Sequence, residues 1–325
     1  MWLSSRKTLL LCTLVLRFKL TNRAMHHANS VKTLADFGYG FNEAGQLRQI
    51  NPVSGTLTNK PFEFAIFEKK AHNQKRYEEL GEVITDYVYN LLEARGMIKL
   101  PIPVDAPLGS GTFIYSTTRE LCRPEKLMIL IHGSGVVRAG QWSRSLIIND
   151  SIWSGTQLLY LEEARKQGYE VIITNTNDNY RDEKSIPGSE DSISHAMYVW
   201  KHYIIPSNPK AVAIVAHSYG GIVTMELAKK HPAFFKDKVF AIGLTDSVHI
   251  GIKGLKDFKE HIKKISRNWV RSEKPLDTKL ESGDPNDVPH YSAGHMQHEY
   301  TSSTCMSALF DFFKDRYEAS ERREM

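Results

Sequence analysis

Residues 211–223 read AVAIVAHSYGGIV: six apolar residues, then His-Ser-Tyr, then two glycines that open a helical pattern. An apolar run of this length is typical of a parallel strand that is buried on both faces. Ser218 is therefore expected on a sharp turn from a strand into a helix. This arrangement approximates the Gly-x-Ser-x-Gly nucleophile elbow, with Ala216 in place of the first glycine.

Small residues are needed on both sides of such a serine. The turn is strained, and the residues two before and two after the serine must let the strand and the helix approach closely. Ala216 and Gly220 meet this requirement. The N-terminus of the helix would stabilise a developing anion next to the serine. We therefore predict Ser218 as the nucleophile and the backbone N–H of Tyr219 as one donor of an oxyanion hole.

A second glycine-containing stretch, Ile131-His132-Gly133-Ser134-Gly135, follows another apolar run. A hydrolase of this architecture places its oxyanion loop after that strand. Glycines let backbone N–H groups turn inward without a Cβ clash. We expect a further oxyanion donor from Gly133, Ser134 or Gly135.

Further patterns predict the rest of the fold. Strands are expected at 126–131, 170–174, 211–216 and 238–244, and helices between them at 156–167, 192–203 and 220–230. This alternation predicts right-handed βαβ units and a doubly wound α/β fold, with a mostly parallel sheet and helices on both faces. Other expected elements are a helix at 73–95, a short strand at 113–115, a loop-rich stretch at 271–290 and a closing helix at 301–316. The domain organisation predicted is a basic leader at 1–35, one domain at 36–317 and a frayed tail at 318–325.

An acid and a base follow Ser218 in the chain order of a Ser-Asp-His triad. Asp246 ends the predicted strand 238–244, and His298 lies just before the closing helix. Loops at the carboxyl ends of parallel strands converge, so the three side chains could meet. Asp277 is a rival for the acid, and His249 and His295 are rivals for the base.

The charge of the chain is concentrated at one end. The 325 residues contain 42 basic and 37 acidic residues, but 1–35 holds six basic residues and no acid, which leaves 36 basic and 37 acidic residues in the rest. A near-neutral body lacks the basic face that phosphate contacts need, so we expect no direct binding to nucleic acid. The three cysteines form no CxxC pair, which supports neither a zinc ribbon nor a disulfide framework. We expect no metal and no cofactor.

The leader admits three interpretations. Its apolar run at residues 9–16 is too short for a membrane-spanning helix, which needs about 20 residues. Basic residues directly after the run and the missing small-residue cleavage site argue against a signal peptide. The lack of acids would suit a mitochondrial-type presequence, and an untargeted, disordered leader is the third interpretation.

Two stretches, KLMILIHGSGVVRAGQW at 126–142 and AHSYGG at 216–221, resemble the Argonaute-binding-protein-two (Arb-two) domain family, in particular its vertebrate cotranscriptional regulators. Shorter matching stretches are FNE at 41–43, GQLR at 45–48, NQKRYE at 73–78, LTDSVH at 244–249 and EKPLDT at 273–278. The likeness covers about residues 36–313. The chain departs from the family at 1–35, which is not acidic, and at 177–192, which lacks a long charged insertion.

The resemblance implies an α/β-hydrolase fold, a hydrolase activity, and a nuclear and cytoplasmic role in Argonaute-linked silencing and splicing at chromatin. The family keeps His-Glu after Ser-Ala-Gly and three variable residues, which matches His298 and Glu299 and favours His298 as the base. The likeness favours Asp246 as the acid, although Asp277 also lies in a matching stretch.

Two classes of function follow. One is a regulatory protein that binds Argonaute and chromatin or splicing proteins. The other is a serine hydrolase for a small acyl ester, thioester or amide, in which Ser218, His298 and Asp246 act as nucleophile, base and orienting acid. A single chain could combine both.

Overall fold

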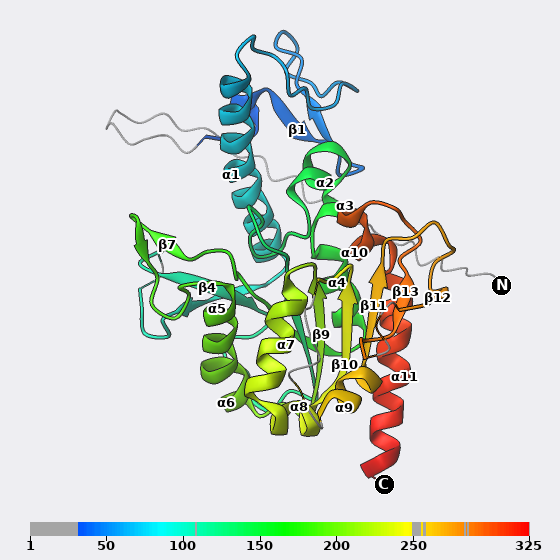
Figure 1. The fold of residues 1–325 in the computed structure, drawn as a ribbon. Helices are drawn as coiled ribbons and strands as arrows, with labels where there is room; N and C mark the ends of the chain where they lie inside the picture. The colour runs from blue at the N-terminus through cyan, green and yellow to red at the C-terminus, as the bar shows by residue number, and fades with distance from the viewer. Residues whose placement is uncertain are drawn as a thin grey trace, which may run out of the picture. The chain divides into compact units, whose positions relative to one another are not determined.

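The computed structural model describes residues 32–107, 109–248, 255, 258–282, 284 and 286–324 (Figure 1). The chain divides into two units, Met1–Lys32 and Thr33–Met325. The description below concerns the second unit. The predicted leader therefore lies almost wholly outside the described residues.

A nine-stranded sheet forms the centre of the described part of this unit, in the order β12-β13-β11-β10-β9-β5-β6-β4-β3. Its strands are β3 Ile98–Ile102, β4 Thr112–Ser116, β5 Lys126–Ile131, β6 Tyr169–Ile173, β9 Ala211–His217, β10 Val239–Thr245, β11 Ser266–Val270, β12 Lys279–Leu280 and β13 His290–Ser292. The six strands from β13 to β6 run parallel. At the two edges, β12 pairs antiparallel with β13, β4 with β6, and β3 with β4. The predicted α/β fold with a mostly parallel sheet is confirmed.

Helices cover both faces of the sheet. The α-helices of the described unit are α1 Lys70–Ala94, α2 Arg144–Asn149, α3 Ile152–Gly155, α4 Leu158–Lys166, α5 Ser192–Val199, α6 Ile205–Ser207, α7 Gly220–Lys230, α8 Pro232–Lys238, α9 Lys259–Ile265, α10 Thr301–Thr304 and α11 Met306–Glu324. A π-helix at Trp200–Ile204 joins α5 to α6, and short 3-10 helices lie at Ala35–Phe37 and His298–Tyr300. Two small antiparallel pairs complete the list: β1 Tyr39–Phe41 with β2 Leu47–Gln49, and β7 Tyr180–Arg181 with β8 Lys184–Ser185. None of the helices among the described residues is long and apolar enough to cross a membrane.

Alternate residues of the central strands face two different cores, because successive side chains of a strand point to opposite faces. In β5, Met128 and Leu130 pack in one core with residues of α1, α4 and α11. Leu127, Ile129 and Ile131 pack in the other core with residues of α5, α7 and α8. Burial on both faces explains the unbroken apolar runs of these strands.

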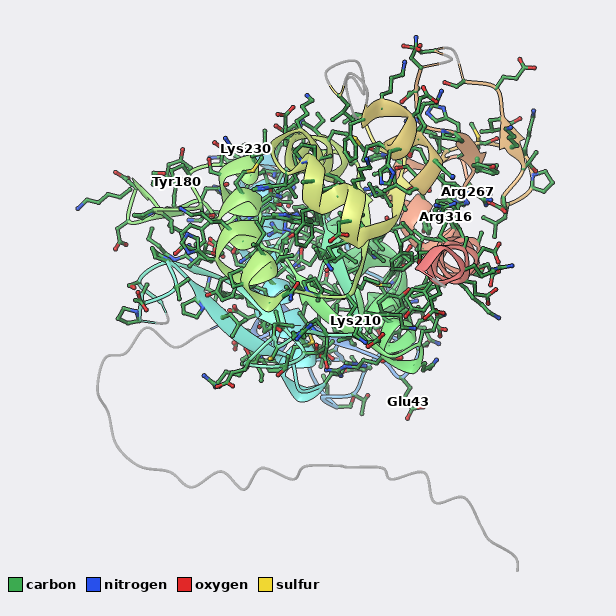
Figure 2. The ribbon with its side chains drawn as sticks, turned by 90° about the horizontal axis from the view of Figure 1, so that it is seen from below. Glu43, Tyr180, Lys210, Lys230, Arg267 and Arg316 are labelled. Atoms are coloured by element: carbon green, nitrogen blue, oxygen red, sulfur yellow. The ribbon has the colours of Figure 1, made fainter. Side chains whose placement is uncertain are left out.

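The parallel strands end at one edge of the sheet. Figure 1 shows the arrows of β9, β10 and β11 pointing the same way, toward α2, α3 and α10. The opposite end of the β9–α7 unit is marked by Lys210, directly before β9, and Lys230, the last residue of α7, both labelled in Figure 2. Residues that follow β9 and β10 are therefore brought together at the upper edge.

Some elements differ from the predicted ones. The closing helix is broken at Cys305 into α10 and α11, and α11 continues to Glu324 through residues predicted as a frayed tail. Strand β11 has the sequence SRNWV, whose polar residues hide it from a search for apolar runs. The stretch 271–290, predicted as loop-rich, contributes β12 and the start of β13.

Candidate active site

Ser218 lies on a tight turn between β9 and α7. Its φ angle of +52° falls in the left-handed region, which is uncommon for a residue with a side chain. Its backbone N–H donates to the carbonyl oxygen of Thr245 at 3.1 Å, which ties the turn to the end of β10. A Cβ atom added to Gly220 would lie 2.8 Å from the carbonyl oxygen of Ile131, so the helix start requires glycine. The local geometry is that of a strained nucleophile elbow.

Asp246 and His298 form a short hydrogen bond beside this turn. Asp246 directly follows β10, and its Oδ2 lies 2.6 Å from Nδ1 of His298. The Asp246 side chain is 12% exposed and that of His298 is 36% exposed. The carboxylate is thus shielded, while one side of the imidazole remains open to a substrate.

The environment of Asp246 favours the ionised carboxylate. Burial alone would raise its pKa, but the hydrogen bond and positive charge of His298 and the neighbouring Arg271 lower the pKa overall. The Arg271 backbone N–H lies 3.4 Å from Oδ1, and its Nε lies 3.6 Å from Oδ2. A charged Asp246 would hold the proton of His298 on Nδ1 and leave Nε2 as the acceptor.

The rival residues take other places. Oδ1 of Asp277 accepts from Nε1 of Trp269 at 2.9 Å, and Oδ2 lies 3.5 Å from Nη1 of Arg267. The Nδ1 of His295 accepts from the backbone of Gln297, and its ring contacts Tyr300. The structure therefore brings neither Asp277 nor His295 to Ser218. His249 lies outside the described residues.

A pocket of about 250 Å³ opens in front of Ser218. His298 lines it on one side, and Gly133 and Ser134 line it on another. A Cβ atom added to Gly133 would lie 3.1 Å from Cβ of Ser218, so the loop touches the nucleophile. Among the described residues, none accepts a hydrogen bond from the backbone N–H of Gly133, Ser134 or Tyr219. These donors suit a substrate oxyanion.

The backbone conformation of two predicted oxyanion residues, Tyr219 and Gly135, suits that role. Tyr219 directly precedes α7, so its N–H is at the positive end of that helix. Gly135 has a φ angle of +100°, a conformation that glycine adopts without strain. The predicted oxyanion residues therefore lie on the two segments that flank Ser218.

Asn177 holds the oxyanion loop from behind. Its Nδ2 donates to the carbonyl oxygens of Gly133 at 2.9 Å and Val137 at 3.1 Å. Its Oδ1 accepts from Oγ of Ser192 at 3.3 Å. One side chain thus fixes both ends of the turn that faces Ser218.

His217 supports the imidazole of His298. The two ring centroids are 4.6 Å apart, and Nδ1 of His217 donates to the carbonyl oxygen of Thr245 at 2.9 Å. Burial, and then the neighbouring His298, lower the pKa of His217 to about 3. His217 is therefore a neutral packing surface at ordinary pH.

Three side chains at this site carry no motif in the sequence: Arg144, Asn177 and Arg271. Asn177 belongs to a polar run directly after β6, and such a run at the carboxyl end of a parallel strand is a usable signal. Arg271 directly follows β11, a strand whose polar sequence gives no apolar run that would predict it. The described residues contain no group of His, Cys, Asp and Glu that could hold a metal ion.

Comparison with known proteins gives concordant results. A family model described as the Arb2 domain matches residues 31–185 and 179–276. The mouse (Mus musculus) "Cotranscriptional regulator ARB2A" is 40% identical over 346 aligned positions, which cover 88% of this chain and 81% of the mouse protein. The human (Homo sapiens) protein of the same name is 40% identical over 345 positions, with the same shares.

Solved structures agree on the fold alone. A histone deacetylase from Saccharomyces cerevisiae superimposes with a TM-score of 0.50 at 13% identity, covering 73% of this chain and 97% of that chain. The family model matches most of the described unit, and the alignments with the mouse and human proteins cover 88% of the chain. The resemblance found in the sequence is thereby confirmed, and the chain belongs to the Arb2 domain family.

Proposed function

We propose that this chain is a serine hydrolase that cleaves a small acyl ester, thioester or amide, in a protein that serves cotranscriptional regulation. The observation that carries the hydrolase proposal is the 2.6 Å contact between Asp246 Oδ2 and Nδ1 of His298, whose imidazole lines the same pocket as Ser218. A strained serine, a base with an oriented tautomer and free backbone donors are the parts that acyl transfer needs.

The proposed reaction has two steps. Ser218 Oγ attacks the substrate carbonyl carbon while His298 Nε2 takes the hydroxyl proton and then gives it to the leaving group. Backbone N–H groups of Tyr219 and of the loop 133–135 stabilise the oxyanion. Water then attacks the acyl-enzyme with His298 again as the base, which releases the acid and restores Ser218.

Labelling with a fluorophosphonate probe tests this activity. The native chain should be labelled, because the probe phosphonylates a serine that a neighbouring base activates. The Ser218→Ala variant should stay unlabelled, and a Ser154→Ala variant, in the α3 turn, should label like the native chain. A native chain that stays unlabelled, or a Ser218→Ala variant that labels equally, contradicts the proposal.

The second candidate function is a binding role. Relatives named cotranscriptional regulators support a regulatory role coupled to transcription, which belongs in the nucleus. We propose Argonaute and chromatin or splicing proteins as partners, as the family resemblance implies, and a cytoplasmic pool beside the nuclear one. Such binding does not require turnover, so it is compatible with a hydrolase site.

A pull-down of purified Argonaute on immobilised chain at mild salt tests this second role. We expect binding to the native chain and to Ser218→Ala alike, because a docking surface does not depend on the nucleophile. No retention above a bead control removes this candidate. Binding that is lost only in Ser218→Ala would instead tie the partner to catalysis.

A further inference from the structure

Arg144 is a buried cation in the wall of the candidate active-site pocket. It is the first residue of α2, it lines the same pocket as Ser218, and it is 4% exposed. Its guanidinium packs on the backbone of α1 at Gly81. A Cβ atom added to Gly81 would lie 2.5 Å from Nη1 and 2.7 Å from Cζ, so the missing side chain makes room for the guanidinium.

The hydrogen-bonding capacity of Arg144 is only partly used. Nη2 donates to the carbonyl oxygen of Val136 at 3.0 Å and to Oε1 of Glu82 at 3.1 Å. Nε is buried without a hydrogen-bond partner, and no described residue accepts a hydrogen bond from Nη1. A guanidinium has five N–H donors, and the two on Nη2 are used, so the donors on Nε and Nη1 have no acceptor among the described residues.

The charge of Arg144 is also poorly compensated. The one acidic partner among the described residues, Glu82, has a side chain that is 68% exposed, so water screens its charge. A buried cation whose only described counter-ion is exposed and screened by water is unfavourable, and binding an anion relieves that cost. Tyr77 lies half-buried in the same wall. Burial raises the pKa of its phenol, and the positive charge of Arg144 opposes that rise.

A second charge in the pocket limits the kind of anion. Glu299, which follows the base His298, also lines the pocket. A singly charged carboxylate would be neutralised by Arg144, whereas a doubly charged phosphate would keep an unpaired charge facing Glu299.

We propose that Arg144 binds a carboxylate on the acyl part of the substrate, so that the substrate class is the half-ester, half-thioester or half-amide of a short dicarboxylic acid. This inference rests on the proposed hydrolase function. Arg144 and Ser218 line the same pocket of about 250 Å³, so the carboxylate and the reacting carbonyl are expected on one short acyl chain. Arg144 would fix the far carboxylate while Ser218 attacks the near carbonyl.

Binding to the Ser218→Ala variant tests the carboxylate site without turnover. The probes are monomethyl glutarate and its neutral counterpart dimethyl glutarate, titrated by calorimetry at low salt. We expect monomethyl glutarate to bind about 10- to 100-fold more tightly, the value of a hydrogen-bonded charge contact. Adding Arg144→Gln should abolish the preference, and adding Glu299→Gln should increase it. Equal binding of the two probes, or a preference that survives Arg144→Gln, overturns the inference.

Two controls keep the test decisive if Arg144→Gln does not fold. Arg144→Lys keeps the positive charge and should retain a reduced preference. For Ser218→Ala alone, raising the salt from 50 to 500 mM should weaken monomethyl glutarate and leave dimethyl glutarate unchanged; a preference that is insensitive to salt contradicts the inference. If the chain prefers monomethyl glutarate but is not labelled by the fluorophosphonate, the carboxylate site is supported and the hydrolase function is contradicted. The failure of one proposal is therefore distinguishable from the failure of the other.

Discussion

Asp246 and Asp277 are the same residue type in the same unusual backbone conformation, with φ angles of +45° and +62°. Aspartate tolerates the left-handed region better than most residues, so the conformation does not tell the two apart. Their partners do: His298 binds Asp246, and the indole N–H of Trp269 binds Asp277. Asp277 therefore has a packing role at the end of β11, and Asp246 is the candidate orienting acid.

This difference predicts opposite effects of matched substitutions. Asp246→Asn should slow fluorophosphonate labelling by about 10³-fold or more, because a neutral amide cannot hold His298 in the reactive tautomer. Asp277→Asn should leave the labelling rate unchanged, although weakening one hydrogen bond should lower the free energy of unfolding by about 1 kcal/mol. Labelling rates and urea unfolding of both variants measure the two effects. Slower labelling in Asp277→Asn, with Asp246→Asn unaffected, would exchange the roles.

The elements around the site differ in how far their sequences predict them. Strand β5 has the predicted bounds because its apolar run is buried on both faces. Helix α7 has the predicted bounds because the glycine pair at 220–221 marks where it begins. Strand β11 is polar and its pairing with β10 and β13 is decided by tertiary contacts, so no local signal predicts it. The elbow and the oxyanion loop are local motifs. The clamp that Asn177 forms on Gly133 spans 44 residues and is visible only in the fold.

The clamp makes a prediction about the oxyanion loop. Asn177→Asp would remove both Nδ2 donors and set a carboxylate against two carbonyl oxygens, so the loop should shift. We expect fluorophosphonate labelling to fall about 10- to 100-fold, in the range of a lost or displaced oxyanion donor. Asn149→Asp, an exposed position in α2, is the matched control and should label normally. Normal labelling of Asn177→Asp with retained thermal stability would show that the clamp does not position the loop.

At the scale of the whole molecule, the body carries a set of buried neutral histidines. Burial lowers the pKa of His132 to about 4 and those of His195 and His217 to about 3. His195 accepts from the backbone N–H of Asn175 and contacts Oγ of Ser189, so its hydrogen bonds specify the neutral ring. Histidine count alone gives no sign of this, because burial is a property of the fold.

These histidines predict a loss of stability in mild acid. Each stays neutral in the folded chain, whereas its unfolded form takes up a proton below pH 6.5. The stabilisation is therefore complete above pH 6.5 and declines as the pH falls toward the folded-state values, by about 2 kcal/mol per histidine at pH 5. Urea unfolding at pH 7.5 and pH 5 measures this decline. His195→Gln should reduce the decline by about 2 kcal/mol, and the exposed His72→Gln should not. An unchanged decline in His195→Gln would contradict this assignment.

The charge distribution sets the first 35 residues apart from the rest of the chain. The excess of basic residues lies in the first 35 residues, and the rest of the chain is close to neutral.

The features that the sequence alone predicts are the fold class, the family and the two local motifs. The choice of acid, the clamp and the buried Arg144 depend on contacts between distant segments, which no pattern of spacing specifies.

Peptide mapping of the fluorophosphonate-treated chain tests the proposal that Ser218 is an activated nucleophile. Mass spectrometry of a tryptic digest should find the phosphonyl adduct on the peptide 211–229, at Ser218, and nowhere else in the native chain. We expect stoichiometric modification there, and none in a chain unfolded before treatment. An adduct confined to another residue, or no adduct on this peptide in the folded chain, would contradict it.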